Sequence, residues 1–214
     1  MGGNGFVIQP NDPPGGVSTS PDLSSPAPPA RPTQRLILFA TLFYGAMGLL
    51  ALIWRAVWLE APLFFDSPQT QAEALLLRDF LLGGGAAVLI ISFSHSLTER
   101  TRFGAELAQA LARLLGPLTT SQCWLLALVS GLGEELFFRG ALQPAVGLWG
   151  ASLLFGLAHF VPRRALAPWA VFAALVGFLL GGLYAATGSL LAPVVTHIGV
   201  NAVNLHFLVR KYGA

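Results

Sequence analysis

Charged residues are scarce in this chain. Only 10% of its 214 residues are Asp, Glu, Lys or Arg, whereas about 25% is usual for a soluble domain. Hydrophobic residues make up 54% of the chain, and its mean hydropathy is +0.66. This composition excludes an ordinary soluble domain and indicates an integral membrane protein, with the lipid bilayer as its surroundings.

The chain also has a single cysteine and no cluster of basic residues. Cys123 is the only cysteine, which excludes an internal disulfide and a cysteine-based zinc cluster. The net charge is +2, and the Lys and Arg residues stand singly or in pairs, which is unlike a nucleic-acid-binding surface. We therefore expect no DNA or RNA partner.

The first 33 residues differ in composition from the rest of the chain. They are rich in Gly, Pro and Ser and cannot bury enough apolar surface to offset the entropy of an ordered chain. This predicts a disordered tail at 1–33, followed by a membrane-embedded helical domain at 34–214.

Long apolar runs fill this second part. A helix needs about 20 apolar residues to cross a hydrocarbon core of about 30 Å. The second run is expected to start at the Ser67-Pro68 pair, which suits a helix cap and the first helical position. The runs together predict an all-α, multi-pass membrane bundle of about six transmembrane helices, at about 36–54, 74–95, 122–143, 148–161, 168–187 and 189–208.

Residues 97–118 have an amphipathic pattern instead. Apolar residues recur there every three to four positions, with charged residues on the rest of the wheel. We expect one interfacial helix, or alternatively an ordinary connecting helix packed on its neighbours.

The distribution of charge predicts an orientation. Most Lys and Arg residues fall in segments that would lie on the same side of the membrane as the N-terminal tail. Because basic residues favour the cytoplasmic side, both termini are expected to face the cytoplasm, in a multi-pass protein of the cell membrane. The first loop on the opposite side is more acidic, with Glu60, Asp66, Glu73 and Asp79 against Arg55 and Arg78.

Three charges interrupt the third apolar run, in the sequence GEELFFRG at 133–140. Each ionisable residue at the centre of a bilayer costs about 2.5–3.5 kcal/mol on insertion scales, so other helices or water must shelter them. Glu135 and Arg139 are one helical turn apart and can form a local ion pair. Glu134 points about 100° away from Glu135 and has no such local partner.

Partners for Glu134 have to come from other membrane helices. The strongly polar candidates are His159 in FGLAHF, then His197 and Asn201 in HIGVN, with Asn204 a further turn along. Glu134, His159 and His197 are all about 12–15 Å deep when counted from the same side of the membrane. A single buried His or Asn often serves only to hydrogen-bond one membrane helix to another, but this combination at one depth indicates a functional site.

These four side chains suit hydrolysis of an amide without a covalent intermediate. Glu134 can take a proton from water and later deliver it to the leaving amine. His159 can hold the same water. His197 and Asn201 can direct N–H donors at the oxygen that becomes anionic when water attacks a carbonyl.

Other chemistries stay open. Cys123 lies about 16 Å along a helix from Glu134, and neither Ser130 nor Ser152 has a nucleophile motif, which disfavours covalent catalysis. Glu and His are zinc ligands, but an HExxH motif is missing, so a metal-dependent membrane hydrolase is the weaker alternative and we expect neither metal nor cofactor. A transporter with a proton relay, or a non-enzymatic membrane regulator, could use the same cluster.

Three short motifs resemble those of one family. EELFFR, FGLAH and HIGVN match, in order, the EExxxR, FxxxH and HxxxN motifs of the CAAX-processing and bacteriocin-processing membrane endopeptidases, the CPBP or Abi family. These proteins resemble the eukaryotic Ras-converting enzyme. The resemblance covers about residues 120–208, and the first half of the chain carries no motif of the family.

The resemblance implies a glutamate-dependent intramembrane endopeptidase that acts on a membrane-anchored protein or peptide. Glu134 would be the catalytic glutamate and His159 its partner in activating water. Glu135 and Arg139 would organise the site. The oxyanion hole would consist of His197 and Asn201.

Overall fold

The computed structural model describes residues 1–2 and 32–212, so almost all of the tail predicted at 1–33 lies outside the described residues. The described part is helical, and a single bridge between extended segments joins Phe65 and Ser189. It contains five runs that are long and apolar enough to cross a membrane, which confirms the predicted helical membrane bundle: Thr33–Leu59, Leu76–Arg100, Thr120–Ala158, Ala167–Thr187 and Leu191–Tyr212.

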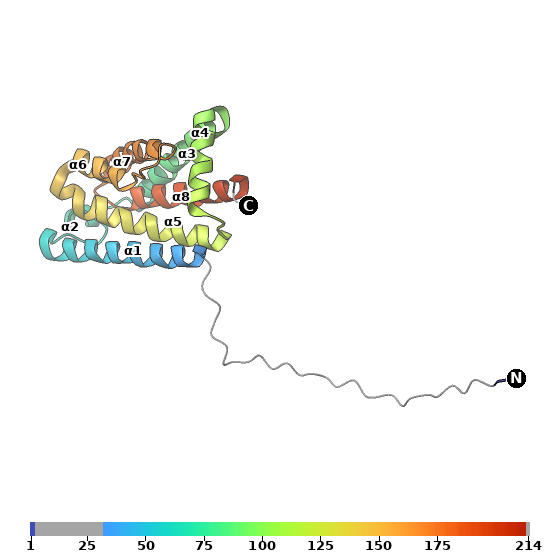
Figure 1. The fold of residues 1–214 in the computed structure, drawn as a ribbon. Helices are drawn as coiled ribbons and strands as arrows, with labels where there is room; N and C mark the ends of the chain where they lie inside the picture. The colour runs from blue at the N-terminus through green and yellow to red at the C-terminus, as the bar shows by residue number, and fades with distance from the viewer. Residues whose placement is uncertain (3–31, 213–214) are drawn as a thin grey trace.

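The helices pack in an order that differs from their order in the sequence. Helix α5 lies between α1 and α8, α8 also packs on α3, and α6 packs on α7 (Figure 1). The helices, with two π-helical segments labelled η, are α1 (Pro32–Trp54), η1 (Arg55–Leu59), α2 (Pro68–Ala72), α3 (Leu76–Arg100), α4 (Arg102–Leu115), α5 (Thr120–Glu135), η2 (Leu136–Leu142), α6 (Gln143–Ala158), α7 (Ala167–Thr187) and α8 (Leu191–Tyr212).

The predicted third and fourth spans are two arms of one helical run, Thr120–Ala158. The run bends at Gly147, whose φ of 73° and ψ of 173° are non-helical and suit a residue without Cβ. In an unbroken helix Arg139 and Phe155 would be about 24 Å apart. The guanidinium carbon of Arg139 instead lies 4.4 Å from the centroid of the Phe155 ring. The second arm therefore folds back and brings α6 to the charged motif.

The helix-start signal at Ser67 and Pro68 begins a short separate helix. Ser67 Oγ accepts a hydrogen bond from the backbone N–H of Thr70 at 3.1 Å, so the cap forms. However, α2 ends at Ala72 and the second membrane helix begins at Leu76. The prediction that the second span starts at Ser67 is therefore wrong. A helix cap depends only on a few neighbouring residues, so it can start a short helix. The start of the membrane span depends instead on the packing of α3 on α8.

Two residues that the charge pattern assigns to the first loop are buried. Arg55 is 1% exposed and donates hydrogen bonds to the carbonyl oxygens of Gly140, Pro62 and Phe65. Asp79 is 0% exposed and pairs with Arg78 in the first turn of α3. Arg55 thus ties the chain after α1 to η2, because its fork of N–H donors can satisfy several backbone carbonyls at once.

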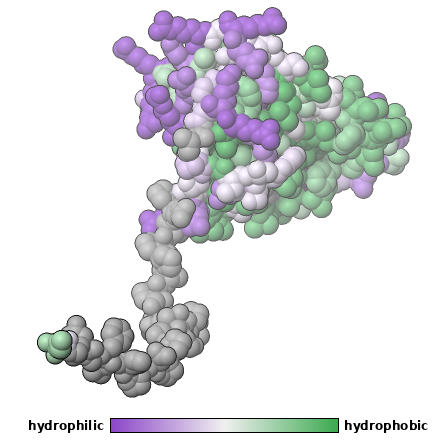
Figure 2. Space-filling model, turned by 90° about the vertical axis from the view of Figure 1, so that its right-hand side faces the viewer, coloured by the Kyte–Doolittle hydropathy of each residue, from purple (hydrophilic) through white to green (hydrophobic). Residues whose placement is uncertain are grey.

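Helix α4 occupies most of the stretch 97–118, for which either an interfacial helix or a connecting helix is predicted, and it lies across the end of the bundle (Figure 1). Its buried face consists of small residues at every fourth position, Gly104, Ala108 and Ala112, and it packs on α3 and α8. The start of α1 and the end of α8 lie at this same end of the bundle, where hydrophilic side chains gather on the surface (Figures 1 and 2). Both ends of the helical domain are therefore on one side of the bundle.

Close contact between α3 and α8 depends on Gly83. A Cβ at this position would lie 2.4 Å from the carbonyl oxygen of Ala192 and 3.0 Å from Cβ of Val195. The approach also allows Thr196 Oγ1 to donate to the Gly83 carbonyl at 2.9 Å. Small residues commonly permit such contacts between membrane helices.

Gly83→Ala is expected to destabilise the bundle by about 1–3 kcal/mol, because the added methyl group must push backbone atoms apart. The matched control is Gly84→Ala, since a Cβ on Gly84 meets nothing within 4 Å. Thermal unfolding in detergent should show a lower midpoint for Gly83→Ala only. Equal midpoints for the two variants would contradict the close packing of α3 on α8.

Candidate active site

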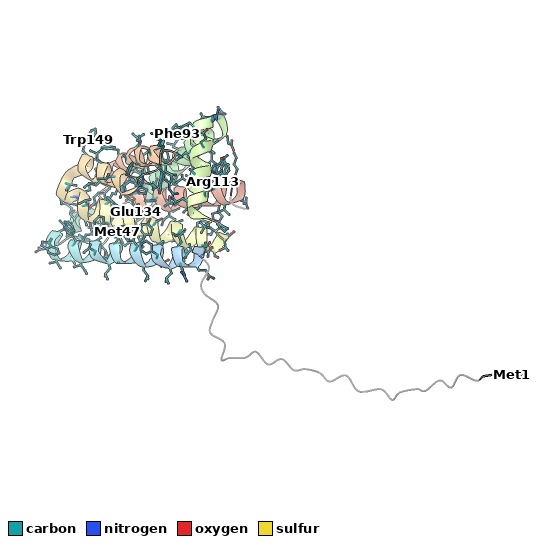
Figure 3. All side chains as sticks on the ribbon, in the orientation of Figure 1. Met1, Met47, Phe93, Arg113, Glu134 and Trp149 are labelled. Carbon is teal, nitrogen blue, oxygen red and sulfur yellow. The ribbon has the colours of Figure 1, made fainter. Side chains whose placement is uncertain are left out.

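The charged motif lies in the interior of the bundle, where α5 passes into η2. Glu134 and Glu135 are the last residues of α5, and Arg139 lies in the π-helical segment. Glu134 is 4% exposed, Glu135 is 0% and Arg139 is 1%. Figure 3 shows Glu134 deep within the bundle. Widened π-turns of this kind occur frequently at functional sites.

Glu135 accepts hydrogen bonds from two other members of the predicted site. Its Oε1 lies 3.0 Å from Arg139 Nη1 and 2.6 Å from His197 Nδ1. Arg139 Nη2 also donates to the carbonyl oxygen of Gly177 at 3.1 Å, and its guanidinium covers the face of the Phe155 ring. The local ion pair expected between Glu135 and Arg139 is therefore present, and it links η2 to α6, α7 and α8.

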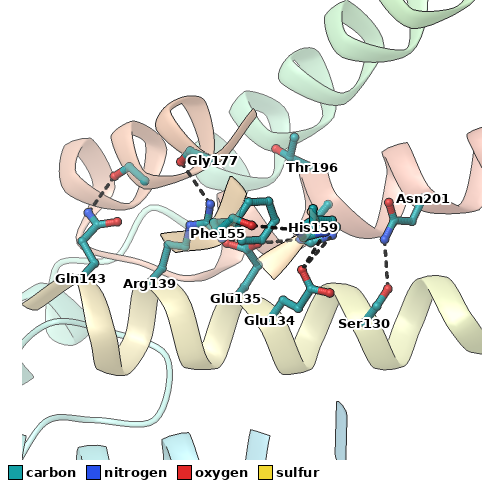
Figure 4. A network of polar contacts seen from close by, with 12 residues as sticks. Ser130, Glu134, Glu135, Arg139, Gln143, Phe155, His159, Gly177, Thr196 and Asn201 are labelled. Carbon is teal, nitrogen blue, oxygen red and sulfur yellow. Dashed lines mark hydrogen bonds and ion pairs between the residues drawn. The ribbon is translucent and has the colours of Figure 1, made fainter. Parts of the chain in front are cut away.

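Glu134 faces the two histidines instead. Its Oε2 lies 3.7 Å from His159 Nε2 and 4.0 Å from His197 Nε2, and it has no hydrogen-bond partner among the described residues. Figure 4 shows Glu134 and His159 directed toward each other from α5 and the end of α6. Both separations exceed a direct hydrogen bond, and both suit contact through one water molecule.

The hydrogen bond made by His159 Nδ1 determines whether His159 Nε2 is a donor or an acceptor toward Glu134. Nδ1 of His159 lies 2.8 Å from the carbonyl oxygen of Phe155. A carbonyl oxygen only accepts, so Nδ1 carries a proton, and in the neutral ring Nε2 presents a lone pair to Glu134. Trp169 packs edge-on against the ring, with the centroids 5.1 Å apart. Glu134 and His159 thus direct two acceptors at one space.

Asn201 lies one turn after His197 on α8 and reaches α5. Its Nδ2 donates to Ser130 Oγ at 2.9 Å, one turn before Glu134 (Figure 4). The four residues predicted to be catalytic therefore surround one region between α5, α6 and α8.

Asn204 does not join this cluster. Its Oδ1 accepts a hydrogen bond from Ser94 Oγ at 3.3 Å and lies 3.1 Å from His95 Nε2, both on α3. The His95 ring also stacks on Phe207, with centroids 4.1 Å apart. Asn204 consequently joins α3 to α8, away from Glu134.

Tyr44 on α1 is a neighbour of Glu134 that the sequence did not reveal. The Tyr44 side chain lies near the Glu134 carboxylate. Helix α1 comes so close because Gly133 has no side chain: a Cβ there would lie 2.6 Å from the Tyr44 carbonyl oxygen. A tyrosine in an apolar run usually packs against other side chains or lies at the membrane interface, so nothing in the sequence assigned Tyr44 to the site.

The donor set of the site can be compared with that of a metal centre. Glu134 and Glu135 direct their carboxylates to different partners, Glu135 to Arg139 and His197, and Glu134 toward His159. Residues 1–2 and 32–212 contain no group of three or more His, Cys, Asp or Glu side chains placed to hold a metal ion. Cys123 lies apart from the site, in an apolar cluster with Ile37 and Leu118.

Comparisons with known proteins concern the region that holds the three motifs. Residues 116–203 match the model of the family described as type II CAAX prenyl endopeptidase Rce1-like, which confirms the resemblance. A stretch of 80 residues is 42% identical to the uncharacterized protein YpbD of Bacillus subtilis (strain 168), and it covers 36% of this chain and 41% of YpbD. The chain thus spans about two fifths of the length of this curated relative. No solved structure matches the chain.

Breaking the Glu135–Arg139 pair should destabilise the protein by about 3–5 kcal/mol, because either Glu135→Gln or Arg139→Ala leaves a buried charge without its partner. Arg102→Ala is a matched control. Arg102 pairs with Glu106 at the same spacing and at 2.9 Å, but the two side chains are 93% and 62% exposed. Thermal unfolding in detergent should be unchanged for this control. Wild-type midpoints for Glu135→Gln and Arg139→Ala would contradict the structural role of the buried pair.

Proposed function

Because residues 116–203 match the model of the type II CAAX prenyl endopeptidase Rce1-like family, we propose that this protein is a glutamate-dependent intramembrane endopeptidase. Its substrate would be a membrane-anchored protein or peptide. The observation that carries the proposal is the pair of acceptors, Glu134 Oε2 and His159 Nε2, which face each other across 3.7 Å in a buried site.

A water molecule fits between these acceptors by its hydrogen-bonding capacity. One O–H can donate to Glu134 and the other to His159 Nε2, which leaves an oxygen lone pair free to attack a carbonyl carbon. As the C–O bond forms, Glu134 takes the proton from the water. The protonated Glu134 then transfers this proton to the amide nitrogen as the C–N bond breaks, which releases an amine and a carboxylic acid.

His197 and Asn201 would stabilise the oxyanion of the tetrahedral intermediate. Nδ1 of His197 donates to Glu135, so donation from Nε2 requires that the ring carry both protons. Glu135 stabilises that cation, and Arg139 shares the same carboxylate oxygen. Asn201 gives one amide hydrogen to Ser130 and has a second one to offer. Donors held in place in a dry site are especially effective at stabilising a developing charge.

The substrate would approach from the side of His159. The side chain of His159 is 16% exposed, whereas those of Glu134 and His197 are 6% and 7% exposed. His159 ends α6, so the segment between α6 and α7 borders this entrance. We place the protein in the cell membrane, with both termini in the cytoplasm, because basic residues gather at the end of the bundle where α1 begins and α8 ends.

Glu134→Gln should lower the cleavage rate at least 100-fold, because an amide cannot accept the proton from water. Purified protein in liposomes would be given a quenched fluorescent peptide that ends in a farnesylated cysteine and three further residues, in parallel with the same peptide without the farnesyl group. Glu106→Gln on the exposed face of α4 serves as the control and should retain full activity. Cleavage by Glu134→Gln at the wild-type rate would rule out the glutamate mechanism.

Cleavage should also persist in metal-free protein with excess 1,10-phenanthroline, because each proposed step uses only side chains and water. The assay compares rates before and after removal of metal, with the metal content of the protein measured directly. Loss of activity that is restored by added zinc would favour a metal-dependent hydrolase.

A further inference from the structure

Ser130 is a buried polar residue that connects α5 to α8, the helix that carries His197 and Asn201. It lies one turn before Glu134 on α5 and is 7% exposed. Helices α5 and α8 are close at this level. A Cβ on Gly131 would lie only 2.7 Å from Ile198 Cγ1 and 3.1 Å from the Ile198 backbone nitrogen. This short distance allows a serine to reach the side chain of Asn201 (Figure 4).

The hydroxyl of Ser130 has a single hydrogen, and the structure shows where it goes. Ser130 Oγ donates to the carbonyl oxygen of Leu126 at 2.7 Å. Toward Asn201 the same oxygen can therefore only accept. The group of Asn201 that lies 2.9 Å away must consequently be the NH2 group, because the amide oxygen would meet a lone pair. Ser130 thereby fixes the orientation of the Asn201 carboxamide, with its NH2 group toward Ser130.

The orientation matters because it decides the sign of the charge that Asn201 presents to the substrate. Asn201 and His197 lie on one face of α8, and His197 Nε2 is 4.0 Å from Glu134 Oε2. With the NH2 group toward α5, one hydrogen binds Ser130 and the amide keeps a second hydrogen for the substrate oxygen. A rotated carboxamide would direct its oxygen there, and two negative oxygens would repel each other.

We propose that Ser130 is a positioning residue that holds the Asn201 carboxamide in the orientation of an oxyanion donor. The inference rests on the proposed function, since it concerns the same reaction. Ser130 itself does not touch the substrate, and it is not a nucleophile, because its hydroxyl hydrogen is committed to Leu126.

A double-mutant cycle in kcat tests this role, with the farnesylated quenched peptide as the probe. Ser130→Ala should lower kcat about tenfold and leave KM within about twofold, because the carboxamide can then rotate. Asn201→Ala should lower kcat by about 100-fold or more. The double variant should match Asn201→Ala, since Ser130 then has no side chain to position. Effects that multiply, or an unchanged kcat for Ser130→Ala while Asn201→Ala is impaired, would overturn the inference.

Ser152→Ala is the matched control in the same domain. Ser152 is 1% exposed on α6, and its hydroxyl has no hydrogen-bond partner among the described residues, so its removal should leave kcat unchanged. A similar loss of kcat in Ser152→Ala and Ser130→Ala would assign the effect to general packing and overturn the positioning role.

A readout that needs no substrate separates this inference from the proposed function. The melting temperatures of the same four proteins in detergent should be non-additive, because each single variant removes the same hydrogen bond. Additive shifts would show that Ser130 and Asn201 are not coupled and would overturn the inference. Wild-type activity in both Glu134→Gln and Asn201→Ala would instead refute the proposed function, whatever the melting temperatures show.

Discussion

One carboxylate oxygen, Glu135 Oε1, holds the site together. It accepts from Arg139 on the next turn of its own helical run and from His197 on α8, and Arg139 continues the network to the backbone of α7. In a bilayer, each of these charged groups would be costly alone, so their mutual neutralisation lets the run carry the charges of Glu135 and Arg139. The same contacts set the rotation of α8 relative to α5, and so they decide what faces Glu134.

The neighbouring glutamates have different environments because successive helical residues differ by about 100° in direction. Glu135 points toward Arg139 and His197, and its Oε1 accepts a hydrogen bond from each of them. Glu134 points toward a space bordered by the two histidines, with an oxygen that has no hydrogen-bond partner among the described residues. A carboxylate that is free to bind a proton, beside one that cannot move, is a suitable arrangement for acid–base chemistry in an apolar interior.

Glycines give the site its dimensions. Gly133 admits α1 and its Tyr44 to the neighbourhood of Glu134, and Gly131 lets α8 approach α5. Gly147 turns the chain so that α6 returns and delivers His159. The first helix, which carries none of the three motifs, thus forms part of the wall of the site. Close backbone contact is therefore as important here as the motif residues, since hydrogen bonds across helices require short distances.

The sequence by itself determined the properties that depend on composition and on a single helix. Helices form in the membrane because each satisfies its own backbone, so the apolar runs predicted the bundle. The pairing of Glu135 with Arg139 followed from their spacing of four residues. Three motifs predicted which side chains would gather around Glu134. Only the tertiary structure decided that Asn204 bonds to α3, that Asn201 rests on Ser130, that Arg55 is buried and that Tyr44 lies beside Glu134. These contacts depend on the rotation and height of one helix relative to another, which packing sets between residues that are far apart in the chain.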